Sequence, residues 1–439
     1  MTKQHIKQLT VTLITLCVAT LSGIKSAEAA SFSVVADGLN NARGLSFGPD
    51  GALYVTEAGN GGNGACIPSV TGQGSLCYGA TGQVLRIENG QTQTALTGLP
   101  SLALADGTNA GGARDIQFDA SGKPYILLGY GANPSFRSNL GNVDLGKIIA
   151  PDFATNSWRS VADLSNYELV NNPDGSDVNS NPLGLFIDGD RLLAVDAGAN
   201  DLLSVRNDGS NLQALAVFPQ EILTNPVFPP SGEPSTEPGQ VPDPTEQPPS
   251  QLPIQVVPSS VVKGPDGAYY VSQFTGFPFP EGKAKIFRVG TDGTTTVYAD
   301  GFTHLTDLEF DSVGNLYALQ YANQSAWKGN FDGSLIKIAT DGTRKTILSG
   351  NGLEAPNALT IGADGAVYIS NRSDRPGQGQ IIRVETSQSV PEPTAVAGLV
   401  AFSVFSLGSL CYQKRNRNRA KTLPWQLHTS HQSLIRTND

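Results

Sequence analysis

The segment Arg43-Gly-Leu-Ser-Phe-Gly-Pro-Asp-Gly-Ala-Leu-Tyr-Val55 places alternating apolar residues on both sides of a Pro-Asp-Gly turn. This pattern predicts two short antiparallel strands joined by a tight turn. Related segments begin at five further positions along the chain: Arg114, Leu183, Ser259, Thr306 and Asn357. Six copies of one strand-turn-strand unit indicate a repeat architecture.

Further short apolar runs follow the copies. Gln83–Ile87 and Lys285–Val289 have the pattern of third strands, and Thr295–Tyr298 has the pattern of a fourth. Four antiparallel strands per repeat make a propeller blade. The sequence, with its 49 glycines and 28 prolines, therefore predicts an all-β protein with a six-bladed β-propeller over residues 30–386.

One strand-like segment, Phe32–Gly38, stands alone before the first copy, and the sixth copy lacks a fourth strand. The lone segment resembles the fourth-strand segment Val297–Gly301. We therefore expect the N-terminal strand to complete the sixth blade and close the ring, which removes free sheet edges.

The first 29 residues have the form of a secretory signal peptide. Lys3 and Lys7 precede an apolar run over Leu9–Leu21, and Ala27-Glu28-Ala29 matches the pattern that signal peptidase cleaves. A retained membrane anchor is the alternative, but the apolar run is short for a span. We expect residues 1–29 to be removed and the propeller to be exported.

The C-terminal region predicts a membrane anchor. A linker at 387–393 carries the box Val390-Pro-Glu-Pro393, the apolar stretch 394–412 is long enough for a transmembrane helix, and the basic tail 413–439 is expected in the cytoplasm. This order resembles the PEP-CTERM sorting signal of bacteria, which implies recognition by sorting machinery. The protein is expected at the cell envelope or extracellular surface, anchored through this helix unless the signal is cleaved.

The charge balance between the two end segments is strongly acidic. Residues 30–413 hold 20 of the 29 Lys and Arg residues against 37 of the 39 Asp and Glu residues, a formal net charge of −17. Nucleic acid binding needs a basic surface, so we expect no nucleic-acid partner.

Histidine and cysteine usage limits the chemistry. His304 is the one histidine of the exported region, and no Gly-x-Ser-x-Gly or His-Glu-x-x-His motif occurs, so we predict that His304 supports a turn. Of the four cysteines, only Cys66 and Cys77 lie outside the end segments. An oxidising compartment predicts a disulfide between them. Zinc is not expected with so few ligands.

Long connections follow the second strand in most copies, which places them on one face of the disc. The Pro-rich insertion at 226–253 leads from the third copy to the fourth and is expected on that face. It reads either as a polyproline spacer or as a partner-binding segment. This loop-rich face is expected to bind an extracellular small molecule, a polysaccharide or a protein, whereas the chain leaves for the anchor from the opposite face.

Two rings of polar residues are expected around the channel mouth on the loop-rich face. The first ring comes from the starts of the innermost strands: Arg43, Arg114, Asp115, Ser259, Thr306, Asp307 and Asn357. The second comes from the ends of the second strands: Glu57, Asp196, Gln273, Gln320 and Asn371. Arg43 and Arg114 together suit a carboxylate or phosphate, and Glu57 with Asp196 suits calcium. Structural salt bridges between these side chains would explain the presence of charged residues at these positions equally well.

The chain resembles the ScyD/ScyE family of cyanobacterial secreted propellers, which is associated with the scytonemin sunscreen pathway. The resemblance is densest at Ser259–Val271, Phe274–Pro280 and Asn181–Leu185. The family commonly has an acidic residue where this chain has Gln273 and Gln320, which weakens a cation site there. A more distant resemblance joins the chain to NHL-repeat proteins and gluconolactonase-like enzymes, whose mouth holds a divalent metal.

Three functions follow as hypotheses. The first is a non-catalytic or accessory protein that binds a pigment precursor or polysaccharide, linked to scytonemin or exopolysaccharide processes. The second is a calcium-dependent gluconolactonase-like hydrolase that uses Glu57, Asp196 and Asn357, with His304 or Asp307 nearby. The third is a structural protein of the matrix. Arg43 and Arg114 would repel a cation at the mouth, which argues against the second.

Overall fold

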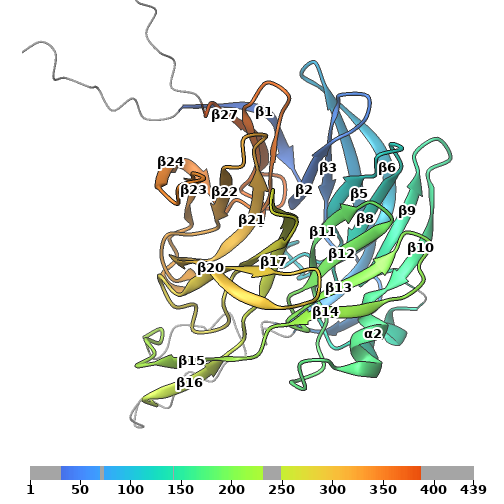
Figure 1. Ribbon diagram of the computed structural model, residues 1–439. Coiled ribbons are helices and arrows are strands. Elements are labelled where there is room, and N and C mark those ends of the chain that lie inside the picture. The colour runs from blue at the N-terminus through green and yellow to red at the C-terminus, as the bar shows by residue number, and fades with distance from the viewer. Residues whose placement is uncertain (1–30, 70–73, 142, 231–248, 387–439) are drawn as a thin grey trace, which may run out of the picture. The chain divides into compact units, whose positions relative to one another are not determined.

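The computed structural model describes residues 31–69, 74–141, 143–230 and 249–386. These ranges form five sheets of four strands and one of five, arranged as blades around an axis (Figure 1). The predicted six-bladed propeller is therefore confirmed. No helix in these ranges is long and apolar enough to cross a membrane. The predicted signal peptide, linker, transmembrane helix and basic tail lie outside the described residues.

Blades 1 to 3 occupy the first half of the described chain. Blade 1 contains β2 (Ala42–Phe47), β3 (Leu53–Glu57), β4 (Cys66–Pro68), β5 (Ser75–Glu88) and β6 (Gln91–Ala103). Blade 2 contains β7 (Ala113–Phe118), β8 (Pro124–Leu128), β9 (Lys147–Asp152) and β10 (Ser157–Asp163). Blade 3 contains β11 (Pro182–Asp188), β12 (Arg191–Asp196), β13 (Asp201–Arg206) and β14 (Gln213–Val217).

Blades 4 to 6 complete the ring. Blade 4 contains β17 (Pro258–Lys263), β18 (Tyr269–Gln273), β19 (Ala284–Val289) and β20 (Thr295–Phe302). Blade 5 contains β21 (Leu305–Phe310), β22 (Leu316–Gln320), β23 (Asp332–Ile338) and β24 (Arg344–Glu354). Blade 6 contains β25 (Leu359–Ile361), β26 (Val367–Asn371), β27 (Gly379–Val384) and β1 (Phe32–Leu39).

The N-terminal strand closes the ring as predicted. β1 pairs antiparallel with β27, from Phe32 opposite Val384 to Leu39 opposite Gly379. Blade 6 is thus assembled from both ends of the described chain, and β1 covers the edge that β27 would otherwise expose.

Six apolar clusters hold neighbouring blades together. The innermost strands contact one another in the closed circuit β2, β7, β11, β17, β21 and β25. Between each pair of blades lies one buried cluster; for example, Leu127 of blade 2 packs with Leu185 of blade 3. Equivalent clusters fill the other interfaces. Burial of each large apolar side chain contributes about 1.5–3 kcal/mol to the free energy of folding. These interfaces are therefore the main source of stability.

The repeated Asp-Gly turns have a shared chemistry in blades 1, 4 and 6. In blade 4, Asp266 accepts hydrogen bonds from the Ala268 amide at 3.2 Å and from Tyr270 Oη at 3.2 Å, and it pairs with Arg288 at 2.7 Å. Blades 1 and 6 repeat this set of aspartate, tyrosine and arginine with Asp50 and Asp364. The carboxylate therefore ties the first turn to the third strand.

The connections on one face carry the elements that do not belong to blades. These are η1 (Pro134–Leu140), α2 (Leu164–Asn171), η2 (Ala326–Lys328) and the two-stranded arm of β15 (Glu221–Thr224) and β16 (Gln251–Ile254). Figure 1 shows α2 and the arm at the bottom, away from the outer end of β27. Most of the predicted Pro-rich insertion lies between β15 and β16 in the sequence. Residues 231–248 of it lie outside the described residues.

Candidate functional site

Arg43 and Arg114 come from adjacent blades, each at the second position of an innermost strand. Arg43 is 7% exposed and its Nη2 donates to the carbonyl of Ala110 at 3.2 Å. The Nε atoms of both arginines are buried without a hydrogen-bond partner. The charge of Arg43 acts on the guanidinium of Arg114.

A glycine leaves the space that Arg114 occupies. A Cβ on Gly129, which directly follows β8, would lie 2.6 Å from Cγ of Arg114. Gly44 follows Arg43 and allows β2 to approach β7, since a Cβ there would lie 2.6 Å from Cα of Asp115. A Cβ at Gly44 would require the backbone to move, and a Cβ at Gly129 would displace the side chain of Arg114, so both glycines shape the mouth.

Burial is the main influence on both guanidinium groups. It lowers the pKa of Arg43, while the nearby Asp374 and Tyr321 oppose this shift. Burial lowers the pKa of Arg114 further, and the positive charge of Arg43 adds to the effect. Arginine stays charged in proteins, so these shifts show two desolvated cations held near each other. Such a pair favours an anion in the space between them.

Aromatic and polar side chains from blades 4 to 6 form the other side of the mouth. Tyr321 Oη donates to Asp374 Oδ2 at 2.7 Å. Phe274 stacks on His304 with ring centroids 4.8 Å apart and lies 5.8 Å from Tyr321. Buried atoms without partners here are His304 Nε2, Asp374 Oδ1 and Thr275 Oγ1. The mouth therefore combines an aromatic wall with unsatisfied polar atoms.

His304 lies in the turn between β20 and β21, where it has a φ of 49°. Its carbonyl accepts the amide of Tyr321 at 2.9 Å, and its Nδ1 lies 3.2 Å from the carbonyl of Phe274. Burial lowers the pKa of His304 to about 4, so the imidazole is neutral at pH 7. These contacts fit the turn-supporting role that the sequence predicts.

Three carboxyl groups lie on the innermost strands of blades 2 and 5: Asp115 on β7, and Asp307 and Glu309 on β21. Asp115 Oδ2 accepts the amide of Leu185 at 2.8 Å, and Asp307 Oδ2 accepts the amide of Leu359 at 2.7 Å, so each aspartate links its blade to the next. Burial and the charge of Asp307 raise the pKa of Asp115 to about 8. Burial, Asp307 and Asp115 raise the pKa of Glu309 to about 8, and burial raises that of Asp307 to about 6.

The side chains of the second predicted ring bind the segments that lead into the blades and, for Gln273, the β15–β16 arm. Glu57 accepts hydrogen bonds from the Asn40 amide and Gln83 Nε2, and Asp196 accepts the Asn181 amide at 2.6 Å. Gln320 and Asn371 accept the amides of Thr303 and Glu354, each at 2.8 Å. Gln273 donates to Glu221 at 3.4 Å. Four of these side chains thus tie the end of the second strand to the segment that enters the blade.

Ser259 and Thr306 of the first ring serve the joints between blades. Ser259 Oγ donates to the carbonyl of Leu305 at 2.7 Å in the next blade, and Thr306 Oγ1 donates to the carbonyl of Pro356 at 3.4 Å. Asn357 instead makes a contact within blade 6, where its amide donates to the carbonyl of Ser370 at 3.0 Å. These residues hold the strands around the mouth in place, and the arginines supply the charged groups of the mouth.

The mouth does not fit the divalent metal of a lactonase. Glu57 belongs to blade 1 and Asp196 to blade 3, and each carboxylate is occupied by donors of its own blade. In the part of the chain that the structure describes, no group of three His, Cys, Asp or Glu side chains is placed to hold a metal ion. The desolvated Arg43 and Arg114 add positive charge where the metal would lie.

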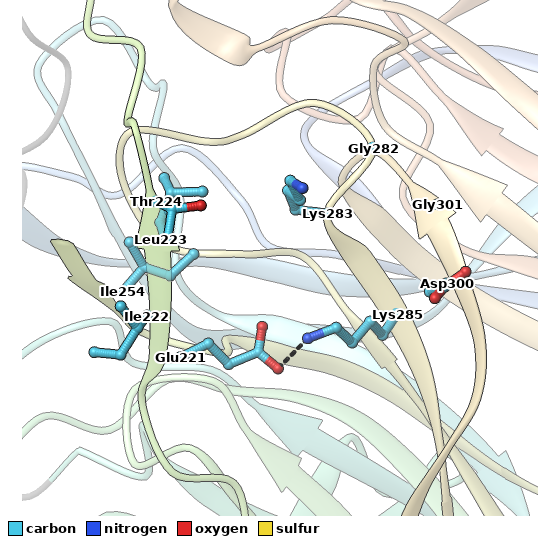
Figure 2. Close-up of a pocket in the computed structure, with 10 residues that line it drawn as sticks. All are labelled: Glu221, Ile222, Leu223, Thr224, Ile254, Gly282, Lys283, Lys285, Asp300 and Gly301. Atoms are coloured by element: carbon cyan, nitrogen blue, oxygen red, sulfur yellow. Dashed lines mark hydrogen bonds and ion pairs between the residues drawn. The ribbon is translucent and has the colours of Figure 1, made fainter. Parts of the chain in front are cut away.

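A pocket of about 610 Å³ lies between the β15–β16 arm and blade 4 (Figure 2). Glu221 and Lys285 form an ion pair across it. The remaining lining is Ile222, Leu223, Thr224, Ile254, Gly282, Lys283, Asp300 and Gly301. Glu221 and Lys285 neutralise each other, so a ligand would not have to balance their charge. The arginine pair at the mouth is therefore the stronger candidate for a binding site.

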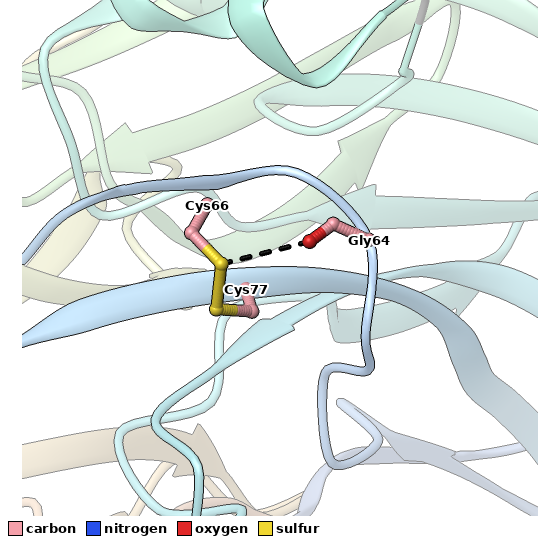
Figure 3. Close-up of a disulfide and its surroundings, with 3 residues drawn as sticks. All are labelled: Gly64, Cys66 and Cys77. Carbon is pink, nitrogen blue, oxygen red and sulfur yellow. Dashed lines mark hydrogen bonds between the residues drawn. A yellow bond between two sulfur atoms is a disulfide. The ribbon is translucent and has the colours of Figure 1, made fainter.

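Cys66 and Cys77 form a disulfide with an S–S distance of 2.00 Å (Figure 3). They lie opposite each other on β4 and β5, and the Gly64 carbonyl oxygen is 3.5 Å from Sγ of Cys66. The bond fixes the long loop of blade 1 beside the mouth. The sequence placed the third strand of this blade at Gln83, whereas β5 begins at Ser75 because β4 extends the pairing.

Comparisons with known proteins add little beyond the architecture. No protein-family model matches the sequence, and no curated protein is significantly similar to it. A streptogramin B lyase has 13% identity and a TM-score of 0.43, covering 81% of this chain and 97% of that one. A gluconolactonase from Xanthomonas campestris has 11% identity and a TM-score of 0.46, covering 81% and 90%. A glucose dehydrogenase has 14% identity and a TM-score of 0.47, covering 81% and 100%. None of these similarities supports a conclusion about activity.

Proposed function

We propose that this protein is a non-catalytic or accessory surface protein that binds a small extracellular molecule with a carboxylate group at the channel mouth. The observation that carries the proposal is the pair Arg43 and Arg114 from adjacent blades, of which Arg43 is buried and Arg114 half-buried. The Nε atoms of both are buried without a hydrogen-bond partner. Unpaired buried donors with positive charge are costly, and a bidentate anion satisfies them.

The charge near the two arginines suits a ligand with a single negative charge. Asp374 lies near Arg43 and offsets part of its charge. Asp115 is the acidic neighbour of Arg114, and its pKa of about 8 keeps it mostly protonated at pH 7. One positive charge therefore stays uncompensated, and a carboxylate supplies the missing negative charge.

The aromatic side chains suit a ligand with a flat ring. Phe274 and Tyr321 are half-buried, with ring centroids 5.8 Å apart, and the buried His304 stacks on Phe274. The charge of Tyr321 acts on Arg43. Rings of this kind bind pigment precursors and the apolar faces of sugars by stacking. The link to scytonemin or exopolysaccharide processes, export through the signal peptide, anchoring by the C-terminal helix and handling by sorting machinery belong to the same proposal and rest on the sequence.

The test is a calorimetric titration with three probes: benzoate, glucuronate and the neutral benzamide. We expect a carboxylate to bind and benzamide not to bind. Arg43→Gln and Arg114→Gln should each weaken carboxylate binding by about 10- to 100-fold, since a hydrogen bond to a charged group contributes about 1.5–3 kcal/mol.

Arg288→Gln is the matched control, because Arg288 lies in an outer ion pair with Asp266 on blade 4. This variant should bind like the wild type. Equal binding of benzamide and benzoate, or undiminished benzoate binding by Arg114→Gln, would contradict the proposal.

A further inference from the structure

Four acidic side chains gather beside blade 3, away from the arginine pair. Glu168 lies on α2, Asp174 lies in the loop that follows this helix, and Asp196 and Asp201 lie at the facing ends of β12 and β13. Asp196 and Asp201 are direct partners across the strand pair. Glu168, Asp174 and Asp196 all lie within electrostatic range of Asp201.

Two of these carboxylates are occupied by ordinary donors. Asp196 accepts hydrogen bonds from Ser180 Oγ at 2.6 Å and from three backbone amides, that of Asn181 being the shortest at 2.6 Å. Asp174 accepts Ser176 Oγ at 2.7 Å and Asn200 Nδ2 at 2.9 Å. These groups need no further partner.

Glu168 and Asp201 lack donors at hydrogen-bonding distance and angle. Their residues are 1% and 0% exposed, and all four of their carboxyl oxygens are buried without a hydrogen-bond partner. Asn179 Oδ1 is also buried without a partner, and its residue lies in the loop between α2 and β11. The side chains present acceptor oxygens only.

The surroundings of Glu168 and Asp201 make their charge unfavourable. Burial raises the pKa of Glu168 to about 7, with Asp196 and Asp174 adding to the shift and the nearby Asn179 amide opposing it. Burial, Asp196 and Glu168 raise the pKa of Asp201 well above its usual value. The charged groups that cause these shifts are all carboxylates. Buried charges in proteins are paired or coordinate metals, and no cationic side chain contributes here.

We propose that Glu168 and Asp201 hold a calcium ion. Calcium prefers oxygen ligands, accepts both carboxylates and amide carbonyls, and completes its coordination with backbone carbonyls and water. The site contains no free sulfur or imidazole, which transition metals favour. No group of three His, Cys, Asp or Glu side chains in the described ranges is placed to hold a metal ion, so the site relies on two carboxylates together with backbone carbonyls and water. It is independent of the ligand proposed for the mouth.

The experiment uses the purified protein after treatment with a chelator. Calcium chloride is titrated calorimetrically, and melting curves are recorded with and without calcium. We expect one calcium ion per chain and a melting temperature that rises by several degrees, because a ligand that binds only the folded state stabilises it.

Glu168→Gln and Asp201→Asn test the ligands directly. Each should weaken calcium binding by about tenfold or more, as the loss of one charged ligand predicts. Without calcium, each variant should melt no lower than the wild type, because the substitution replaces a buried carboxyl group that has no hydrogen-bond partner. Loss of calcium binding without loss of calcium-free stability is not expected from a merely structural role.

Glu57→Gln is the control, since Glu57 is a buried acid with its own donors in blade 1. It should bind calcium like the wild type. The proposal would be overturned by a wild type that binds no calcium, by preference for magnesium, by Glu168→Gln and Asp201→Asn that bind normally, or by loss of binding in Glu57→Gln.

Discussion

Asp115 and Asp307 occupy equivalent positions in blades 2 and 5, which lie three blades apart in a ring of six. Each accepts the amide of the following blade, so the two carboxyl groups act as joints between innermost strands. Glu309 lies two residues after Asp307 and therefore faces the same side of β21. Burial is the main cause of the raised pKa of all three acids; the charge of Asp307 adds to it for Asp115, and the charges of Asp307 and Asp115 add to it for Glu309.

Glu309→Gln should make the stability less dependent on pH. The folded chain binds the proton of Glu309 more tightly than the unfolded chain does, because its pKa is raised from 4.5 to about 8. The free energy of unfolding should therefore fall as pH rises from about 5 to about 8, by up to ~1.4 kcal/mol per pH unit for each such group.

Urea unfolding at several pH values and one calcium concentration measures this effect. Glu309→Gln should lose less stability over that range than the wild type. Glu88→Gln is the control, since Glu88 is exposed and paired with Arg86. An unchanged pH profile in Glu309→Gln would show that the carboxyl group does not titrate as described.

At the scale of elements, the repeated turn accounts for the sequence motif. The aspartate of the turn, the tyrosine of the second strand and the arginine of the third strand meet in blades 1, 4 and 6. The strand boundaries could thus be predicted closely, because turn chemistry and alternation both mark them. β4 and α2 could not, since β4 has only three residues and α2 depends on its Asp163 cap, which accepts the Asn166 amide at 2.9 Å.

The disulfide of blade 1 should contribute about 2–3 kcal/mol to the free energy of unfolding, because it closes a short loop of sequence separation 11. The double variant Cys66→Ser/Cys77→Ser should therefore unfold at lower urea concentration than the wild type. Equilibrium unfolding without reductant measures the difference. Addition of reductant should bring the wild type to the stability of the variant and leave the variant unchanged; equal stability of the two proteins before reduction would contradict the prediction.

At the scale of the whole molecule, sequence reasoning predicts the ring better than the site. Six copies of one motif and the lone strand Phe32–Gly38 specify the number of blades and the closure, because both follow from local patterns. Arg43 and Arg114 could be placed at the mouth because they begin equivalent strands. Tyr321 and Asp374 could not, since their positions depend on loop conformation, and the unpaired state of Glu168 and Asp201 depends on packing between separate segments.

Removal of β1 should open the ring. A mature chain that begins at Asn40 would leave β27 as an exposed edge, and exposed edges promote association between chains. We expect a lower midpoint of urea unfolding and larger species in light scattering. Val34→Ala is the control, because Val34 is 49% exposed and its substitution keeps the backbone pairing. A monomeric shortened chain with unchanged unfolding would show that blade 6 closes without β1.

The closure also determines how the propeller bears mechanical load. β27 is the last described strand, and it pairs with β26 on one side and β1 on the other. A pull applied through Thr386 therefore acts along an internal strand and loads two rows of backbone hydrogen bonds in shear. An edge strand would instead peel away from a single neighbour. The strand that leads toward the predicted anchor is thus the one in blade 6 best placed to resist tension.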